Sequence, residues 1–590
     1  MKRVVWSAVL GLGLVACTPD EPEAPAPVED GATVLQMTLR PVHDTAEGAF
    51  VSFDVTLQFD ALTIAAGEPV LRLPLVTSNV DTVATVLSDL DVRDPAGAVM
   101  LTVADVDQPE NSAGDAVSGG PSREWRADRA VQGPVTVTYT VPAHATLPPR
   151  GPAPPFSFSN DGGGVSGAGH IFLLLPPDAG PFDTQIRWDM SAAPAGTSGV
   201  TSLGGGDVRA SEPVSARELR MGFFMAGDIQ TWPEPLPEDG FFGALQGHPP
   251  FDGEALLAWT GELYGHYEDF FSQTDAPPYG VFLRENPVNA GGGVGLHRSF
   301  VTTFGQERGN DPEAIKLTLA HEMFHTFQPF ISEPGGLESS WFSEGLATFY
   351  QSRLPLRYGM TSPERVLEDI NFHAGRYYSS IMADAPNSLV PERFWADTRI
   401  RTLPYDRGML YFATIDHAVR TRSEGARSLD DLTLAMLERS DREGGASNAD
   451  WEAVLEAELG AEAVTGFRAF LEGEIPLPEP DAFGPCFTRT QAELRRYELG
   501  FDTAVLAEPV RIIRGLQPGS AAAEAGLQNG DEILQPVPQD HLQGSQDMTL
   551  TLEIRRGDAV FDVTYLPRGE TVPAWQWERV EGVPDSACAL

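Results

Sequence analysis

The stretch from Asp311 to Gln328 reads DPEAIKLTLAHEMFHTFQ and decides how the rest of the sequence is interpreted. Aspartate followed by proline is typical of a helix start, with the aspartate as N-cap and the proline at the first helical position. On such a helix His321 and His325 lie four residues apart and share one face. Two imidazoles so placed can bind one metal ion, and Glu322 beside them can take a proton from a water molecule.

A second predicted helix, WFSEGLATFYQSRL, supplies a third metal ligand. Glu344 follows His325 by nineteen positions, and an antiparallel helix pair would bring its carboxylate to the same ion. The alternative is a glutamate on a solvated helix face, but among Trp, Phe, Leu and Tyr an unpaired carboxylate is costly. Catalytic zinc takes three protein ligands and keeps one position open. The sequence therefore predicts one Zn²⁺ bound by His321, His325 and Glu344.

Local patterns predict a multidomain α+β chain. From about 32 to 215, period-two stretches such as VSFDVTLQF and PVTVTYTV alternate with Pro/Gly-rich turns, which predicts an N-terminal β domain; HIFLLLPP is a further strand candidate. After 216, strand-like MGFFMAG and YGVFLREN give way to helices from 312 onward. The further predicted helices are SPERVLEDI, GMLYFATIDHAVRTR, SLDDLTLAMLER and ADWEAVLEAEL.

Three motifs resemble the gluzincin metallopeptidases and, within them, the glycyl aminopeptidase family (metallopeptidase family 61). They are AHEMFHTFQP, WFSEGLATFY and Tyr405-Asp406-Arg407-Gly408 with the LYFATIDHAVRTRSEGARSLDDL that follows. The resemblance implies a thermolysin-like catalytic domain over 216–475 and zinc-dependent peptide hydrolysis, with a family preference for small N-terminal residues. It also implies that Tyr405 donates a hydrogen bond to the oxyanion, although a core tyrosine is the alternative.

One segment departs from the family pattern. These families place a Gly-Gly-Leu-Glu-His-like segment on the edge strand before the zinc helix, and its glutamate binds the free amine of the substrate. The matching stretch here runs from Gly293 to Ser299 and has Leu296 where the glutamate is expected. An aminopeptidase and a zinc endopeptidase of relaxed specificity therefore both stay open. His297 is either a residue of the cleft or a structural histidine.

After a linker over 476–489, the last module, residues 490–590, resembles a PDZ domain. Leu499-Gly500-Phe501 resembles the loop that receives a peptide carboxylate, and GLQPGSAAAEAGLQNGDEIL resembles the segment that follows it in bacterial PDZ domains. The resemblance implies that a C-terminal peptide adds as a strand in the PDZ groove. Pro536 and Pro538 interrupt the second groove helix, so a purely structural module is the alternative.

The first 31 residues carry export signals. Residues 1–16 read as a signal peptide, and Leu14-Val15-Ala16-Cys17 resembles a bacterial lipobox, at which Cys17 becomes lipidated. Residues 17–31 form a Pro/Glu-rich tether. An ordinary signal peptide with an incidental cysteine is the alternative. Together with Thr18, the pattern predicts an exported lipoprotein, periplasm-facing or on the cell surface, that is attached to the outer membrane by its lipid anchor.

The other two cysteines and the charge also bear on function. In an oxidising compartment Cys486 and Cys588 are expected to form a disulfide rather than two free thiols. The chain has 84 acidic residues against 40 Lys and Arg, giving a net charge of −44, which disfavours binding of nucleic acid.

Two classes of function follow. The first is a zinc peptidase that acts on peptides or proteins. The second is a catalytically idle, lipid-anchored scaffold that binds peptides through its PDZ module. Structural zinc sites usually close with four protein ligands, so a three-ligand set next to Glu322 favours the enzyme.

Overall fold

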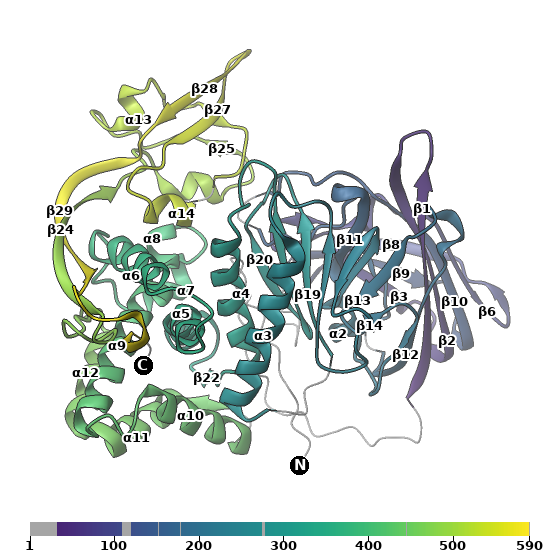
Figure 1. Cartoon of the computed structure of the whole chain (residues 1–590). Helices are drawn as coiled ribbons and strands as arrows, with labels where there is room; N and C mark the ends of the chain where they lie inside the picture. Colours follow the sequence, from purple (N-terminus) through teal and green to yellow (C-terminus); the bar gives the residue numbers. More distant parts are fainter. Residues whose placement is uncertain are drawn as a thin grey trace. The chain divides into compact units, whose positions relative to one another are not determined.

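The computed structural model describes residues 32–108, 120–150, 153–177, 179–273, 278–443, 445–537 and 539–588 (Figure 1). The predicted signal peptide and tether, with Cys17, lie outside these residues. The chain divides into two compact units, and the main boundary falls between Glu322 and Met323. Helix α4 (Pro312–Phe327) contains this boundary, so one continuous helix contributes to both units.

The N-terminal unit is rich in β structure, as the period-two stretches predicted. The stretch VSFDVTLQF lies in β2 (Ala49–Ile64) and PVTVTYTV in β10 (Val131–Pro142), and the two strands pair antiparallel. Buried and half-buried residues alternate along both strands, because one face of the sheet covers the core. The seven-stranded sheet has the order β15 (Val208–Arg209), β12 (Phe182–Trp188), β1 (Thr33–Asp44), β2, β10, β6 (Ser88–Asp94), β7 (Gly97–Ala98).

Smaller sheets complete the β-rich region. One has the order β3 (Pro69–Pro74), β9 (Gly120–Ala127), β8 (Leu101–Gln108); another has β11 (Gly164–Ala168), β16 (Phe223–Gly227), β13 (Ser198–Thr201), β14 (Gly204–Gly205). The strand expected at HIFLLLPP is wrong. Its first residues form the short helix α1 (Gly169–Phe172), and Leu175 makes only an isolated bridge to Arg72. Residues 170–176 of this run are buried, and continuous burial suits a helical turn as well as a strand.

A five-stranded mixed sheet precedes helix α4 in the chain. Its order is β17 (Ile229–Trp232), β18 (Phe241–Gln246), β19 (Tyr279–Glu285), β21 (Ser299–Phe304), β20 (Gly293–Leu296), with β20 an antiparallel edge strand. Between β18 and β19 lies helix α3 (Gly253–Phe271), to which the sequence analysis assigned no element. The Tyr267 hydroxyl of α3 donates to the carbonyl oxygen of Ala320 in α4 at 3.0 Å, so α3 supports α4.

The C-terminal unit begins with a helical region. Its helices are α5 (Ser340–Arg357), α6 (Pro363–Tyr378), α7 (Leu389–Arg393), α8 (Thr398–Arg401), α9 (Leu403–Arg422), α10 (Leu429–Glu443), α11 (Asn448–Leu459) and α12 (Ala461–Leu471). Helix α5 is buried from Ser340 to Leu356, and α9 packs along it. Trp341 of α5 lies among the rings of Phe412, Trp451 and Phe467. Because protein interiors are closely packed, a helix buried on all sides has little freedom to move, and its side chains are fixed in position.

Strands return after the helices. Figure 1 shows β24 (Phe487–Tyr497) and β29 (Arg568–Arg579) side by side as a long antiparallel ribbon. The ribbon leads to a four-stranded sheet of β25 (Arg511–Ile512), β26 (Glu532–Ile533), β27 (Leu550–Arg556) and β28 (Ala559–Tyr565), with short helices α13 (Ala521–Glu524) and α14 (Gln539–Gly544). This module has its own core around Leu499, Phe501 and Leu552.

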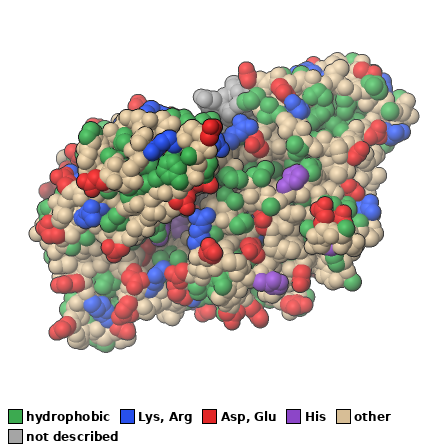
Figure 2. All heavy atoms as spheres, turned by 90° about the horizontal axis from the view of Figure 1, so that it is seen from above, with side chains coloured by type: hydrophobic (Ala, Val, Ile, Leu, Met, Phe, Trp, Pro, Cys, Tyr) green, Lys and Arg blue, Asp and Glu red, His purple; other side chains and the backbone are tan. Residues whose placement is uncertain are grey.

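Two further features concern the surface. No helix in the described ranges is both long and apolar enough to cross a membrane. On the face drawn in Figure 2, Asp and Glu side chains are spread widely, with Lys and Arg scattered among them. That distribution accords with the net charge of −44.

Candidate metal centre

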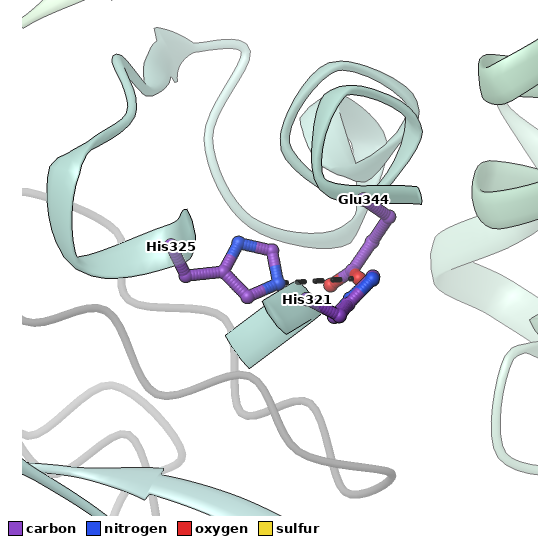
Figure 3. A group of neighbouring side chains, drawn as sticks. All are labelled: His321, His325 and Glu344. Atoms are coloured by element: carbon purple, nitrogen blue, oxygen red, sulfur yellow. Dashed lines mark ion pairs between the residues drawn. The ribbon is translucent and has the colours of Figure 1, made fainter. Parts of the chain in front are cut away.

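Three predicted ligands converge between helices α4 and α5. One ligand atom from each of His321, His325 and Glu344 lies within 4.8 Å of the others. Nε2 of His325 is 3.5 Å from Oε2 of Glu344, and Figure 3 shows the His325 ring directed at that carboxylate. His321 is 8% exposed, His325 1% and Glu344 0%. The sequence spacing therefore brings together the two histidines and the glutamate in a nearly dry site.

The donor set fits zinc. Two imidazole nitrogens and one carboxylate oxygen are ligands that zinc takes in catalytic sites, where a fourth position stays open. Ligand atoms bonded to one tetrahedral zinc ion lie about 3.3–3.6 Å apart. The 3.5 Å between His325 and Glu344 matches that spacing. When bound, a zinc ion would be held by His321, His325 and Glu344.

A glutamine that the sequence analysis did not single out orients His325. The side-chain amide of Gln328 lies 2.8 Å from Nδ1 of His325, on the far side of the ring from Glu344. Among the described residues, Oε1 of this buried amide has no hydrogen-bond partner. A half-turn of the amide presents Oε1 to the Nδ1–H group, as an imidazole that binds metal through Nε2 requires. The signal was the spacing, since Gln328 lies one helical turn after His325.

Close packing of two glycines fixes Glu344. Gly345 and Gly408 face each other where α5 and α9 cross. A Cβ on Gly408 would lie 2.6 Å from the Cα of Gly345 and 2.7 Å from the carbonyl oxygen of Trp341. Only glycine permits this approach of two backbones. The crossing therefore sets the distance from α9 to the helix that carries Glu344.

Tyr405 lies in the first turn of α9, one turn before Gly408, and is half-buried. Its neighbour Asp406 accepts from Nε and Nη2 of Arg376 at 2.8 and 2.6 Å and lies 2.7 Å from Nδ1 of His373. Burial alone would lower the pKa of Arg376, but Asp406, Asp540 and Tyr405 raise it. The polar residues around Tyr405 thus form a fixed network of charges.

The edge strand β20 carries no carboxylate at the position where the sequence resemblance led us to look for one. Leu296 closes β20, is 1% exposed and belongs to the core of the N-terminal unit. The backbone N–H of His297 donates to Met221, and its Nε2 lies 3.8 Å from a carboxylate oxygen of Glu218. Burial lowers the pKa of His297 to about 4, despite Glu218. These contacts agree with the structural alternative for His297.

The remaining predicted residues lie in the C-terminal module. Leu499 and Phe501 are each 3% exposed, and the Tyr565 hydroxyl donates to the carbonyl oxygen of Leu499 at 2.9 Å. Gly500 has a φ of +87°, and its Cβ position is filled by Ser520 and Ala522. Cys486 and Cys588 are bonded to each other, with Cα atoms 5.0 Å apart.

Comparison with known proteins gives a structural likeness. Neither a scan of protein-family models nor a search of curated proteins finds a match to this sequence. Among solved structures, an aminopeptidase N family protein from Idiomarina loihiensis is similar over 92% of this chain and 98% of its own, with a TM-score of 0.60 and 16% identity. An M1 zinc metallopeptidase from Deinococcus radiodurans matches 76% of this chain and 94% of its own, with a TM-score of 0.43 and 16% identity. At such identity the likeness concerns the fold alone, and the chain shares the fold of the aminopeptidase N family structure.

Proposed function

We propose that this protein is a zinc-dependent metallopeptidase. The observation that carries the proposal is the convergence of His321, His325 and Glu344 within 4.8 Å, with Glu322 on the same helix between the two histidines. Three buried ligands match a catalytic site better than a structural one, because structural zinc sites are usually closed by a fourth protein side chain.

The residues have distinct roles in this proposal. Zinc, when bound, supplies Lewis-acid activation of water and of the scissile carbonyl. Glu322 accepts the proton of the attacking water and returns it to the leaving amine. Tyr405 donates a hydrogen bond to the oxyanion, where a fixed donor acts most strongly. Gln328 holds the ring of His325 in the orientation that directs Nε2 inward.

Substrate choice follows from the edge strand. The family resemblance implies an aminopeptidase that prefers small N-terminal residues. Leu296 offers no carboxylate to the free amine, which favours relaxed specificity or endopeptidase action. Comparing cleavage of free and N-acetylated forms of the same peptides separates these alternatives. An aminopeptidase should fail to cleave the acetylated peptides, whereas an endopeptidase should cleave both the free and the acetylated forms.

The ends of the chain carry two more proposals. Cys17 anchors the exported protein to the outer membrane through lipid, and the Cys17→Ala variant should leave the membrane fraction. Recovery of that variant in the membrane fraction would exclude the anchor.

The PDZ-like module offers its groove to a C-terminal peptide. Titration of the module with carboxylate-ended and amide-ended peptides tests this, since equal or no binding would exclude carboxylate recognition.

The deciding experiment uses Glu322→Gln. Metal analysis should find zinc in the variant as in the wild type. Its turnover of a peptide library should fall by about 10²–10⁴-fold, because the general base is gone. Glu313→Gln is the matched control, since Glu313 lies on the same helix and its carboxylate, 46% exposed, pairs with Lys316 in the described structure. Cleavage by Glu322→Gln at the wild-type rate would exclude this mechanism. A zinc-loaded wild type without Glu322-dependent cleavage would instead be the idle scaffold.

A further inference from the structure

The C-terminal module is bound to the helical region through a buried aspartate. Asp540 in α14 accepts from Nη2 of Arg401 in α8 at 2.5 Å and from Nε at 3.0 Å, and the Thr398 hydroxyl also donates to it. The two charged side chains are only 15% and 7% exposed. An ion pair so little exposed is weakly screened, and loss of one partner leaves a buried charge without compensation.

Arg376 of α6 extends this contact to α9. Its Nη1 donates to the backbone carbonyl of Asp540 at 3.2 Å, while Nε and Nη2 donate to both carboxylate oxygens of Asp406. Bidentate pairing of this kind fixes the orientation of the guanidinium group as well as its distance from the carboxylate. The ring of Phe372, on α6, also stacks on that of His541, on α14, with centroids 5.8 Å apart. One arginine therefore joins α14 of the module to the first turn of α9.

Tyr405, the proposed donor to the oxyanion, lies in the first turn of α9. Tyr405 directly precedes Asp406. Further along α9, the Gly408–Gly345 crossing holds the helix against α5. The first turn is thus held on one side by the glycine crossing and on the other by the Arg376–Asp540 contact with α14.

We propose that α14 of the C-terminal module positions Tyr405 through Asp540, so that turnover depends on the module being docked. The carboxylate of Asp540 holds Arg401 and Thr398 of α8, directly before α9, while its backbone carbonyl holds Arg376 and thereby Asp406. The inference rests on the proposed role of Tyr405. It makes Asp540 a positioning residue, since Asp540 acts through others. It also separates two effects: the metal ligands lie on α4 and α5, so zinc binding should not depend on Asp540.

The test compares Asp540→Asn with Asp531→Asn in the full chain. Asp531 is a matched control because it is buried in the same module and pairs with Arg556, at 2.6 and 2.7 Å, away from α6 and α8. Four quantities are measured in both variants: kcat, KM, zinc content and hydrogen–deuterium exchange of peptides covering residues 398–408. Asp540→Asn should lower kcat about tenfold at unchanged KM and zinc content, since a misplaced oxyanion donor acts on the transition state.

Exchange over residues 398–408 should rise in Asp540→Asn and stay at the wild-type rate in Asp531→Asn. Wild-type exchange and wild-type kcat in Asp540→Asn would overturn the proposal. So would equal changes in both variants, because they would reflect general destabilisation of the module. If the wild type shows no Glu322-dependent turnover, the proposed function fails, while exchange still decides whether Asp540 holds the first turn of α9.

Discussion

His325 is held from both sides of its ring. Nε2 faces Glu344 and Nδ1 meets Gln328, so the ring has one orientation available for metal binding. The grouping of His321, His325 and Glu344 was predictable from sequence because helical spacing and the second motif fix it. Gln328 was missed, because its partner is known only once the ring orientation is known. The pairing of Asp540 with Arg401 was also not predictable, since 139 positions separate the two residues.

Tyr405→Phe tests the oxyanion role at the scale of one atom. Removal of the hydroxyl should lower kcat by about 10²–10³-fold and leave zinc content unchanged. Tyr411→Phe is the control on the same helix, because the Tyr411 hydroxyl accepts from the indole of Trp451 at 3.0 Å inside the aromatic core. That control should lose stability and keep kcat. Wild-type kcat in Tyr405→Phe would make Tyr405 a core tyrosine.

At the scale of elements, a helix start was predictable where a capping pair marks it and was missed where charged residues hide the apolar pattern. The Asp311-Pro312 pair predicted the start of α4, which begins at Pro312. The predicted helix GMLYFATIDHAVRTR began at Gly408, whereas α9 begins at Leu403. Buried Asp406 and Arg407 hid the apolar pattern there, because their partners, Arg376 for Asp406 and the carbonyl oxygen of Ala385 for Arg407, lie outside α9. Glycines at 253, 261 and 265 weakened the helical pattern of α3, and packing overrides that weak propensity.

Gly408→Ala tests the crossing of α5 and α9. The added methyl would meet backbone atoms at 2.6 and 2.7 Å, so the helices must separate, at a cost of about 1–3 kcal/mol. Thermal unfolding should show a lower midpoint, and kcat should fall because both Glu344 and Tyr405 adjoin the crossing.

Gly466→Ala is the matched control for the crossing. Gly466 lies in α12 with nothing within 4 Å of its Cβ position. Alanine there should raise stability by about 0.4–1 kcal/mol, because it restricts the unfolded chain. If both variants changed the midpoint of thermal unfolding in the same way, the glycine packing would not be what sets how closely α5 and α9 approach.

At the scale of the whole molecule, the disulfide closes the largest covalent loop that the described structure contains. Cys486 and Cys588 are 102 positions apart. In the chain-entropy model a loop of this size is worth roughly 4–5 kcal/mol. The double variant Cys486→Ser, Cys588→Ser should therefore unfold at lower denaturant concentration than the oxidised wild type. A reducing agent should destabilise the wild type and leave the double variant unchanged; a wild type insensitive to reduction would contradict the prediction.

The ribbon of β24 and β29 has a consequence for how such chains diversify. Because the two strands run side by side, the polypeptide enters and leaves the terminal sheet at neighbouring points. A segment whose ends are adjacent can be replaced by another fold with similarly spaced ends, without rerouting the rest of the chain. A substitute would have to reproduce the contacts that dock the module on the helices, among them the carboxylate of Asp540 on Arg401 and the ring of His541 on Phe372.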